Sequence, residues 1–439
     1  MNIGIVSLQF EKTATGGGGV HVAHITSEFL KMGHKVRILS IHTNKTIGDA
    51  NLNNEEAPFS VETRGDLQVI RFLIEENIDQ PYAGTKQEEL DRIKKFCDVC
   101  AQYIKENQEN FDVVNLQGHH LVPGYMAKEL TQIKPKTVSY LHALETTYVT
   151  KDGNFVGAYD GTKEILSTIR EWESMCRFAD FVIGNSPIVN EEIKGIIAEY
   201  DKSPEKYYSK IKLIASGCNL DFLMSNKDVL EKLREEPETI NMVTFCRVDP
   251  SKGVEYSIEG ASEAAKLSNK KFKLTIAGIP SSKEYIEKLK KIAEDVPENL
   301  EVEFFLLEAI SPLEEKKGIL DDKHIYILPT LKEPFGMSLI EASARGNIVV
   351  SAETNGPKYM FESEKFDSNE WGILTKRGVL AHITDNPKEK FKKNIGKAIS
   401  CVADNWEEST QRVLNFNNKI RDTWTWEGIA QQYIDLFKS

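Results

Sequence analysis

Short apolar runs alternate with longer amphipathic stretches through the first half of the chain. The runs are rich in β-branched residues and nearly continuous, which is typical of strands buried on both faces of a sheet. Most of the gaps between them have the spacing of helices. The predicted strands are 3–8, 35–41, 68–74, 111–116, 136–141, 180–183 and 211–215. Buried strands separated by helices predict an α/β fold with a parallel, doubly wound sheet.

The pattern stops in a charged segment and then starts again. The later apolar runs are 241–245, 272–277, 300–306, 324–328 and 347–350. The restart predicts a second domain of the same architecture. We therefore expect a Rossmann-like domain over 1–218, a linker over 219–240 and a second Rossmann-like domain over 241–415. Such sheets bind ligands beyond the carboxyl ends of their strands, so a ligand cleft is expected between the two domains.

The C-terminal segment 416–439 is predicted to end in a helix. Between 423 and 438 its apolar residues recur at helical spacing on one side. Such a face needs a surface to pack on, and the N-terminal domain is one candidate for it. The sequence does not fix where the helix docks.

Charge and composition narrow the classes of protein. The chain has 439 residues, of which 40% are apolar and 28% are charged, as in a folded protein. Its net charge of −12 disfavours binding to nucleic acid or anionic lipid. Residues 1–8 read as a strand rather than a signal peptide, and no run of about eighteen apolar residues could cross a membrane. Six sparse cysteines suit a reducing compartment, so a cytoplasmic location is expected.

No metal site and no bound cofactor are predicted. Cys97 and Cys100 have a metal-like spacing, with His119 and His120 as possible partners, but they lie in a predicted helix, where residues three apart simply share a face. The chain also contains no Asp-x-Asp, a pattern that would supply carboxylates to hold a cation against a diphosphate.

A glycine-rich loop follows the first predicted strand. The run from Gly16 to Gly19 precedes a helix over 20–32, and glycine there lets the backbone approach an anionic or hydroxylated ligand. His21 stands where the dinucleotide fingerprint needs glycine, and 41–44 contain no acidic residue for a nicotinamide ribose. The loop therefore disfavours a nicotinamide cofactor.

Two carboxylates flank a predicted helix start in the second half. Glu333 lies in the loop after the strand ending at 328, and Glu341 lies in the helix that this loop begins. Backbone N–H groups near Phe335, Gly336 and Met337 would complement them. Carboxylates and N–H donors together suit a polyhydroxylated ligand, although a surface helix with two acids near its positive end is the simpler alternative.

Two cations flank another predicted helix start upstream. Arg247 and Lys252 lie around the turn that follows the strand 241–245. This arrangement suits a diphosphate. The alternative is an ion pair with Asp249 or Glu255.

Taken in order, these segments resemble retaining glycosyltransferases of the GT-B fold, in family 4, which includes sucrose-phosphate synthases and relatives of glycogen synthase. The similarity runs over nearly the whole chain. The segments that carry it are the glycine loop with its helix and GHKV, then FDVVNLQGH, TVSYLH, ADFVIGNS, CRVDPSKGV, EPFGMSLIE with its two glutamates, and TNGP. The resemblance implies two Rossmann-like domains that face each other across a cleft.

The resemblance also assigns roles. Arg247 and Lys252 would bind the donor diphosphate, Glu333 the sugar hydroxyls and Glu341 the ribose, while His142 would face the donor sugar. Further donor-binding positions would be Gly18, Gly19, Phe335, Gly336, Met337, Ser338, Asn355 and Gly356. It implies metal-independent, retaining transfer of a hexosyl unit, with UDP-glucose or UDP-N-acetylglucosamine as the expected donor.

Three departures leave the substrates open. Cys246 stands where the family usually has glycine, TNGP has one glycine fewer than NGGP, and HALE follows the strand where sucrose-phosphate synthases have HSLG. The acceptor could be a small molecule, a glycan or a peptide. Two alternatives to transfer are a GT-B nucleotide-sugar epimerase and a sugar-nucleotide-binding homologue without activity.

Overall fold

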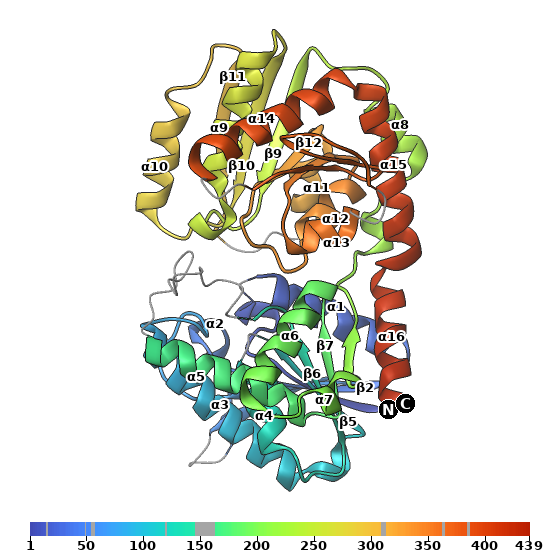
Figure 1. The fold of residues 1–439 in the computed structure, drawn as a ribbon. Coiled ribbons are helices and arrows are strands. Elements are labelled where there is room, and N and C mark those ends of the chain that lie inside the picture. The colour runs from blue at the N-terminus through green and yellow to red at the C-terminus, as the bar shows by residue number, and fades with distance from the viewer. Residues whose placement is uncertain are drawn as a thin grey trace. The chain divides into compact units, whose positions relative to one another are not determined.

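The computed structural model describes residues 1–14, 16–48, 50–53, 58–118, 121–144, 163–308, 313–361, 365–383 and 387–439. These residues form two compact units, drawn in Figure 1. The first unit contains the described residues from Met1 to Ser216 together with Trp426–Ser439. The second unit contains the described residues of Gly217–Thr425.

The described part of the first unit contains an eight-stranded sheet with the order β3-β4-β2-β1-β5-β6-β7-β8. Its strands are β1 (Asn2–Val6), β2 (Lys35–Ile41), β3 (Phe59–Arg64), β4 (Leu67–Phe72), β5 (Val113–Gly118), β6 (Lys136–Leu141), β7 (Phe181–Gly184) and β8 (Ile211–Leu213). Neighbouring strands are parallel except β3 and β4, and β1 pairs with β2 in the register Ile3↔Val36. The central strands are buried almost throughout, which explains their continuous apolar runs.

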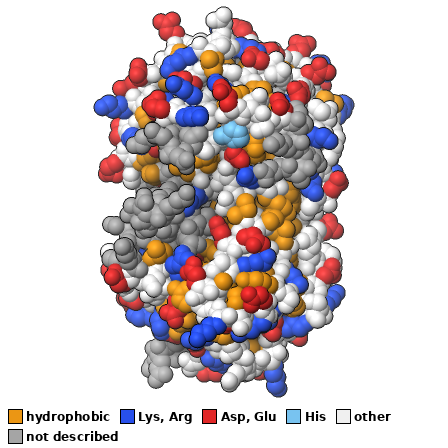
Figure 2. Space-filling model, viewed as in Figure 1, with side chains coloured by type: hydrophobic (Ala, Val, Ile, Leu, Met, Phe, Trp, Pro, Cys, Tyr) orange, Lys and Arg blue, Asp and Glu red, His pale blue; other side chains and the backbone are white. Residues whose placement is uncertain are grey.

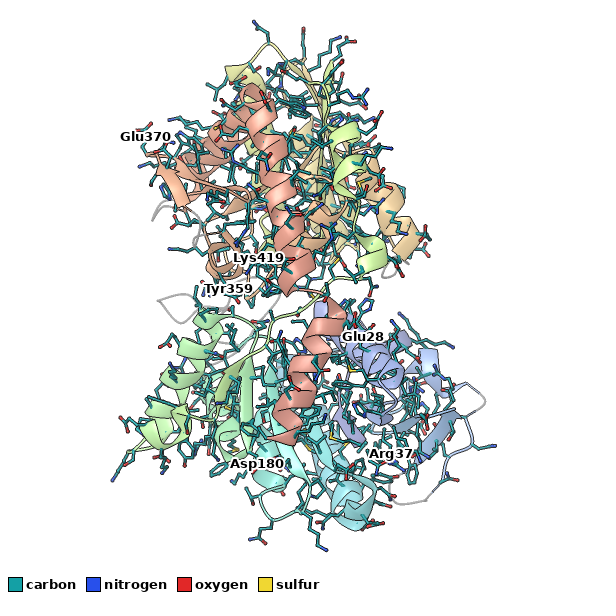
Figure 3. All side chains as sticks on the ribbon, turned by 90° about the vertical axis from the view of Figure 1, so that its right-hand side faces the viewer. Glu28, Arg37, Asp180, Tyr359, Glu370 and Lys419 are labelled. Atoms are coloured by element: carbon teal, nitrogen blue, oxygen red, sulfur yellow. The ribbon has the colours of Figure 1, made fainter. Side chains whose placement is uncertain are left out.

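Helices cover this first sheet. They are α1 (Gly17–Lys31), α2 (Asn44–Ile47), α3 (Lys86–Glu106), α4 (Leu121–Glu129), α5 (Lys163–Ser174), α6 (Pro187–Tyr200), α7 (Glu205–Tyr208) and α16 (Trp426–Lys438). The C-terminal helix α16 packs on α1, where the rings of Tyr433 and Phe437 contact Phe29. Figure 3 labels Glu28 of α1 beside this helix. The apolar side of α16 therefore completes the core of the first unit.

The described part of the second unit contains another eight-stranded sheet, with the order β11-β10-β9-β12-β13-β16-β15-β14. Its strands are β9 (Thr239–Phe245), β10 (Lys271–Gly278), β11 (Leu300–Leu306), β12 (Ile325–Leu328), β13 (Ile348–Ala352), β14 (Lys365–Ser368), β15 (Gly372–Thr375) and β16 (Val379–Ala381). Strands β14, β15 and β16 form an antiparallel edge on a parallel sheet.

The helices of the second unit are α8 (Asn226–Lys232), α9 (Val254–Leu267), α10 (Lys283–Ala293), α11 (Leu313–Asp321), α12 (Met337–Ala344), α13 (Asn355–Phe361), α14 (Pro387–Asp404) and α15 (Trp406–Thr423). Helices α9 and α14 lie against each other in Figure 1. A Cβ on Gly260 of α9 would lie 2.3 Å from a side-chain carbon of Ile395 in α14, so glycine lets the two helices approach closely.

The predicted fold class is confirmed, because both sheets are mostly parallel and alternate with helices. The sequence reading missed β3 and the short strands β14, β15 and β16. Strand β3 is exposed along most of its length, so it lacks the apolar run of a buried strand. Cys97 and Cys100 are buried in α3 as part of the apolar core, whereas His119 and His120 lie outside the described residues.

The exposed side chains and the length of the helices bear on whether the chain could span a membrane. On the face drawn in Figure 2, acidic and basic side chains are interspersed. No described helix is both long enough and apolar enough to span a bilayer.

Among the parallel strands described in each sheet, the strand order reverses direction at one point. In the first unit this point lies between β1 and β5, and in the second unit it lies between β9 and β12. Loops at the carboxyl ends of the two strands diverge there, which makes the point a common ligand site in open α/β sheets.

Candidate functional site

The loop after β9 places Lys252 at the reversal point of the second sheet. Asp249 caps the short 3-10 helix Pro250–Lys252 by accepting a hydrogen bond from the Ser251 N–H at 2.9 Å. Gly253 then takes a left-handed conformation with φ of 62°, and a Cβ there would lie 2.8 Å from the Pro329 carbonyl oxygen. Glycine thus lets the loop after β9 approach the loop after β12.

Across this approach Lys252 contacts Glu333. The Lys252 Nζ lies 2.7 Å from a carboxylate oxygen of Glu333, and the two side chains are 21% and 12% exposed. Although 81 residues separate them, the cation and the carboxylate predicted for different parts of a ligand form one ion pair. Such a pair gives a ligand both a donor and an acceptor at one place.

The TNGP loop joins the same place. The Gly356 N–H donates to the Glu333 carbonyl at 2.7 Å, and the Thr354 hydroxyl lies within hydrogen-bond reach of the Glu333 N–H at 3.4 Å. A Cβ on Gly356 would lie 1.9 Å from the Phe335 carbonyl oxygen. The backbones of the two loops are in contact there, and Asn355 begins α13 immediately beside them.

Helix α12 carries the second glutamate. Gly336 precedes it with φ of 105°, which favours glycine, and the helix begins at Met337. Glu341, on this helix, pairs with Lys316 of α11 at 2.6 Å. Each carboxylate of the predicted pair therefore has its own lysine, and Ser338 lies on the helix between them in sequence.

Arg247 lies at the more open side of this loop. Its side chain is 51% exposed, and its Nη2 lies 3.9 Å from Asp249, which is a loose ion pair. Cys246 is next to it, and burial raises the pKa of its thiol to about 12, so the side chain is a neutral thiol at neutral pH. The alternative ion pair with Asp249 thus occurs, but it leaves the guanidinium largely in solvent.

In the first unit, His142 and the glycine loop lie together. His142 follows β6, and a Cβ on Gly18 would lie 3.6 Å from a carbon of the His142 ring. Gly19 is closely packed, because a Cβ there would lie 2.5 Å from the Ala14 side chain. The loop after β1 and the loop after β6 therefore meet beside the reversal point of this sheet.

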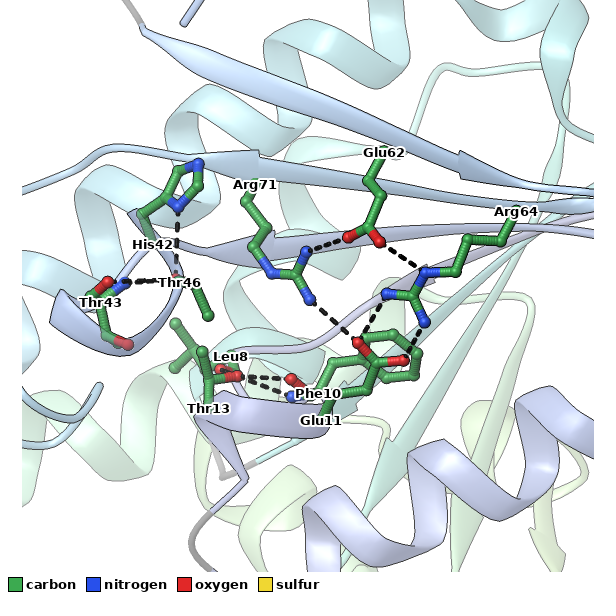
Figure 4. Close-up of polar contacts among 10 residues, drawn as sticks. All are labelled: Leu8, Phe10, Glu11, Thr13, His42, Thr43, Thr46, Glu62, Arg64 and Arg71. Carbon is green, nitrogen blue, oxygen red and sulfur yellow. Dashed lines mark hydrogen bonds and ion pairs between the residues drawn. The ribbon is translucent and has the colours of Figure 1, made fainter. Parts of the chain in front are cut away.

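A second polar cluster in the first unit was not predicted from the sequence. Arg64 and Arg71 form hydrogen bonds of 2.6 to 3.3 Å with Glu11 and Glu62, and these contacts are drawn in Figure 4. Hydrogen bonds from Arg64 lower the pKa of Glu11. Burial lowers the pKa of the nearby His42 to about 4, so that ring is neutral. A cavity of about 310 Å³ is lined by His42, Thr46, Ala50, Asn51, Ser60, Val61, Glu62 and Arg71.

The predicted residues thus fall into two groups. Lys252, Glu333, Gly336 and Gly356 meet around the reversal point of the second sheet, and His142 meets Gly18 in the first unit. Sequence reasoning missed Lys316, because it lies in a charged helix without a distinguishing pattern. Within the described residues, no cluster of three His, Cys, Asp or Glu side chains could hold a metal ion.

Comparison with known proteins gives the family of the chain. Residues 225–401 match the family described as "Glycosyl transferases group 1", and residues 2–201 match "Starch synthase catalytic domain". The chain is 24% identical over 433 residues to a probable sucrose-phosphate synthase of Thermosipho melanesiensis, covering 96% of this chain and 90% of the relative.

Two solved structures share the fold. A sucrose-phosphate synthase from Thermosynechococcus elongatus is 16% identical with a TM-score of 0.71, and the match covers 100% of this chain and 98% of that one. An Anabaena protein in complex with UDP and glucose is 14% identical with a TM-score of 0.63, and the match covers 100% of both chains. This chain is a glycosyltransferase of the GT-B fold, whose N-terminal part matches the starch synthase catalytic domain family and whose C-terminal part matches the group 1 family.

Proposed function

We propose that the protein is a retaining hexosyltransferase that uses a UDP-sugar, UDP-glucose or UDP-N-acetylglucosamine, without a metal ion. The acceptor is a hydroxylated small molecule, glycan or peptide bound by the first unit. The proposed location is the cytoplasm, which suits the sparse cysteines of the sequence.

The Lys252–Glu333 ion pair is the observation that carries the proposal. It places a cation and a carboxylate 2.7 Å apart at the reversal point of the second sheet, beside the start of α12. A nucleotide sugar presents a diphosphate next to a hydroxylated ring, so one such pair complements both parts. The UDP and glucose held by the similar Anabaena protein support a uridine nucleotide as donor.

The proposed chemistry needs no protein nucleophile. Lys252 and Arg247 stabilise the negative charge that grows on the departing diphosphate, so they favour the transition state over the bound donor. Glu333 holds the sugar hydroxyls, Glu341 holds the ribose, and His142 faces the donor sugar. The acceptor hydroxyl attacks from the side that the leaving group vacates and passes its proton to an oxygen of the departing diphosphate, which retains the anomeric configuration.

A donor panel tests this function. The full chain is incubated with UDP-glucose, UDP-N-acetylglucosamine, ADP-glucose and GDP-mannose, each with and without a hexose or a hexose phosphate as acceptor, and released nucleotide is measured. We expect acceptor-dependent release of UDP. Epimerised nucleotide sugar formed without acceptor would favour the epimerase, and UDP binding without turnover of any donor would favour the inactive homologue.

Activity is expected to survive chelation of metal ions. The proposed site balances the diphosphate with Lys252 and Arg247, so the rate of nucleotide release in 5–10 mM EDTA, about a hundredfold excess over trace metal, should equal the untreated rate. A parallel reaction with added Mg²⁺ or Mn²⁺ is the control. Loss of activity in EDTA that either ion restores would refute the role given to the two cations.

A further inference from the structure

A chain of buried hydrogen bonds in the first unit ends at His142. The two ring nitrogens of His21 each lie 3.0 Å from a hydroxyl oxygen, Nδ1 from Ser216 and Nε2 from Tyr433. Gln117 Nε2 donates to the Tyr433 hydroxyl at 3.2 Å, and Gln117 Oε1 lies 3.1 Å from His142 Nε2. The chain thus connects α1, the C-terminal helix α16, β5 and the loop after β6.

The members before His142 are sealed from solvent. His21, Gln117 and Tyr433 are 0% exposed, and Ser216 is 2% exposed. Burial lowers the pKa of His21 well below its ordinary value, with the nearby His142 and His24 acting in the same direction. His21 is therefore neutral, with one nitrogen that donates and one that accepts.

The orientation of the Gln117 amide gives the direction of the hydrogen bonds on either side of it. Its Nε2 donates to the Tyr433 oxygen. The neutral His21 ring supplies one donor and one acceptor to Tyr433 and Ser216. At the other end, Gln117 offers its carbonyl oxygen, so His142 must donate from Nε2.

We propose that Tyr433 and Gln117 are positioning residues that hold His142 in the Nε2–H tautomer and aim its ring at the donor sugar. The proposal rests on the function given to His142 above. The Tyr433 oxygen accepts from Gln117 Nε2, and in this orientation the Gln117 Oε1 faces His142. A neutral His142 that donates from Nε2 carries its lone pair on Nδ1, the atom that can accept a hydrogen bond from a sugar hydroxyl.

Packing fixes the His142 ring as well. It lies edge-on to His21 with ring centroids 5.0 Å apart, and tilted against Tyr140 at 4.6 Å. The His142 carbonyl accepts a hydrogen bond from Asn185 at 2.7 Å, which holds the backbone. Ring packing and the backbone hydrogen bond thus support the position of the ring, and Gln117 contacts its Nε2.

Tyr433→Phe tests the proposal by kinetics. The ring stays in place, but the Gln117 amide loses the acceptor that orients it, so we expect kcat to fall roughly 5–20-fold with the donor KM within about twofold. Tyr207→Phe is the control, because it removes a partly buried hydroxyl on α7 that donates to the Asp201 carboxylate at 3.0 Å, outside this chain of hydrogen bonds. Its kcat should stay within about twofold of the wild-type value.

Gln117→Met is a second kinetic test of the proposal. It removes both ends of the amide at similar length, so it should lower kcat as Tyr433→Phe does. The kcat of the double variant should be no lower than that of the less active single variant, because both changes act through the same hydrogen bonds. Additive losses, or a Tyr433→Phe enzyme with wild-type kcat, would overturn the proposal.

The tautomer itself can be measured without turnover. Nitrogen NMR of the ¹⁵N-histidine-labelled full chain, with the His142 signals assigned from His142→Gln, should show the Nε2–H form in the wild type and a mixture of both forms in Tyr433→Phe. An Nδ1–H form in the wild type, or an unchanged tautomer in Tyr433→Phe, would refute the proposal. This result does not depend on the donor, so failure of the inference is distinct from failure of the proposed function.

Discussion

Replacing Lys252 by alanine is expected to lower kcat/KM for the donor by about 100-fold or more. A charge-assisted hydrogen bond to phosphate contributes about 1.5–3 kcal/mol, which is roughly 10–150-fold. The variant also leaves Glu333, whose side chain is only 12% exposed, without its cation. The remaining carboxylate would repel the diphosphate, so the loss should lie at the upper end of that range. Steady-state release of nucleotide measures it.

Two further variants isolate the site from general effects of charge. Lys288 of α10 pairs with Glu255 of α9 at 3.0 Å, and Lys288→Ala removes this cation. The kcat/KM of this variant should stay within about twofold of the wild-type value. Lys252→Ala combined with Glu333→Gln restores the local charge balance, and it should recover thermal stability but not activity. Wild-type kinetics in Lys252→Ala would mean that Lys252 serves only in a structural ion pair.

The two glutamates are expected to give opposite kinetic effects. Glu333→Gln should lower kcat by about 100-fold, because it removes negative charge beside the anomeric carbon, where positive charge develops. The same substitution releases Lys252 from its ion pair, so UDP should bind this variant at least as tightly as it binds the wild type. Glu341→Gln should instead raise the donor KM about tenfold with a smaller change in kcat, because the ribose keeps its charge during transfer.

Calorimetric titration of UDP separates these roles. We expect UDP to bind Glu333→Gln at least as tightly as the wild type and to bind Glu341→Gln weakly, with both variants unfolding near the wild-type temperature. Equal losses of affinity, or the reverse order, would mean that the two carboxylates have been assigned to the wrong parts of the donor.

Local patterns in the sequence were enough to predict both sheets and some of the turns beside them. The apolar runs of β2 and β9 reflect burial on both faces, and Gly336 and Gly253 mark turns that need positive φ. Each of these features is predicted from a few neighbouring residues in the sequence. Strand β3 gave no such signal, because exposure removes the need for an apolar run.

Pairings between distant segments were not predictable in this way. Lys252 and Glu333 are 81 residues apart, and Gln117 and Tyr433 are 316 residues apart. Nothing in either local pattern specifies the partner, because the contact depends on how the strands are ordered in the sheet. Helix α16 shows the same limit: its apolar side predicts that it packs, whereas only the fold gives α1 as the surface.

The anomeric configuration of the first product tests the central claim most directly. Proton NMR follows the reaction of the full chain with the α-linked UDP-sugar that gives acceptor-dependent release of UDP. We expect the transferred sugar to appear as the α anomer from the first turnovers, as transfer on the face vacated by the diphosphate requires. A β-linked product, or release of UDP with the sugar passed only to water, would contradict retaining transfer by this protein.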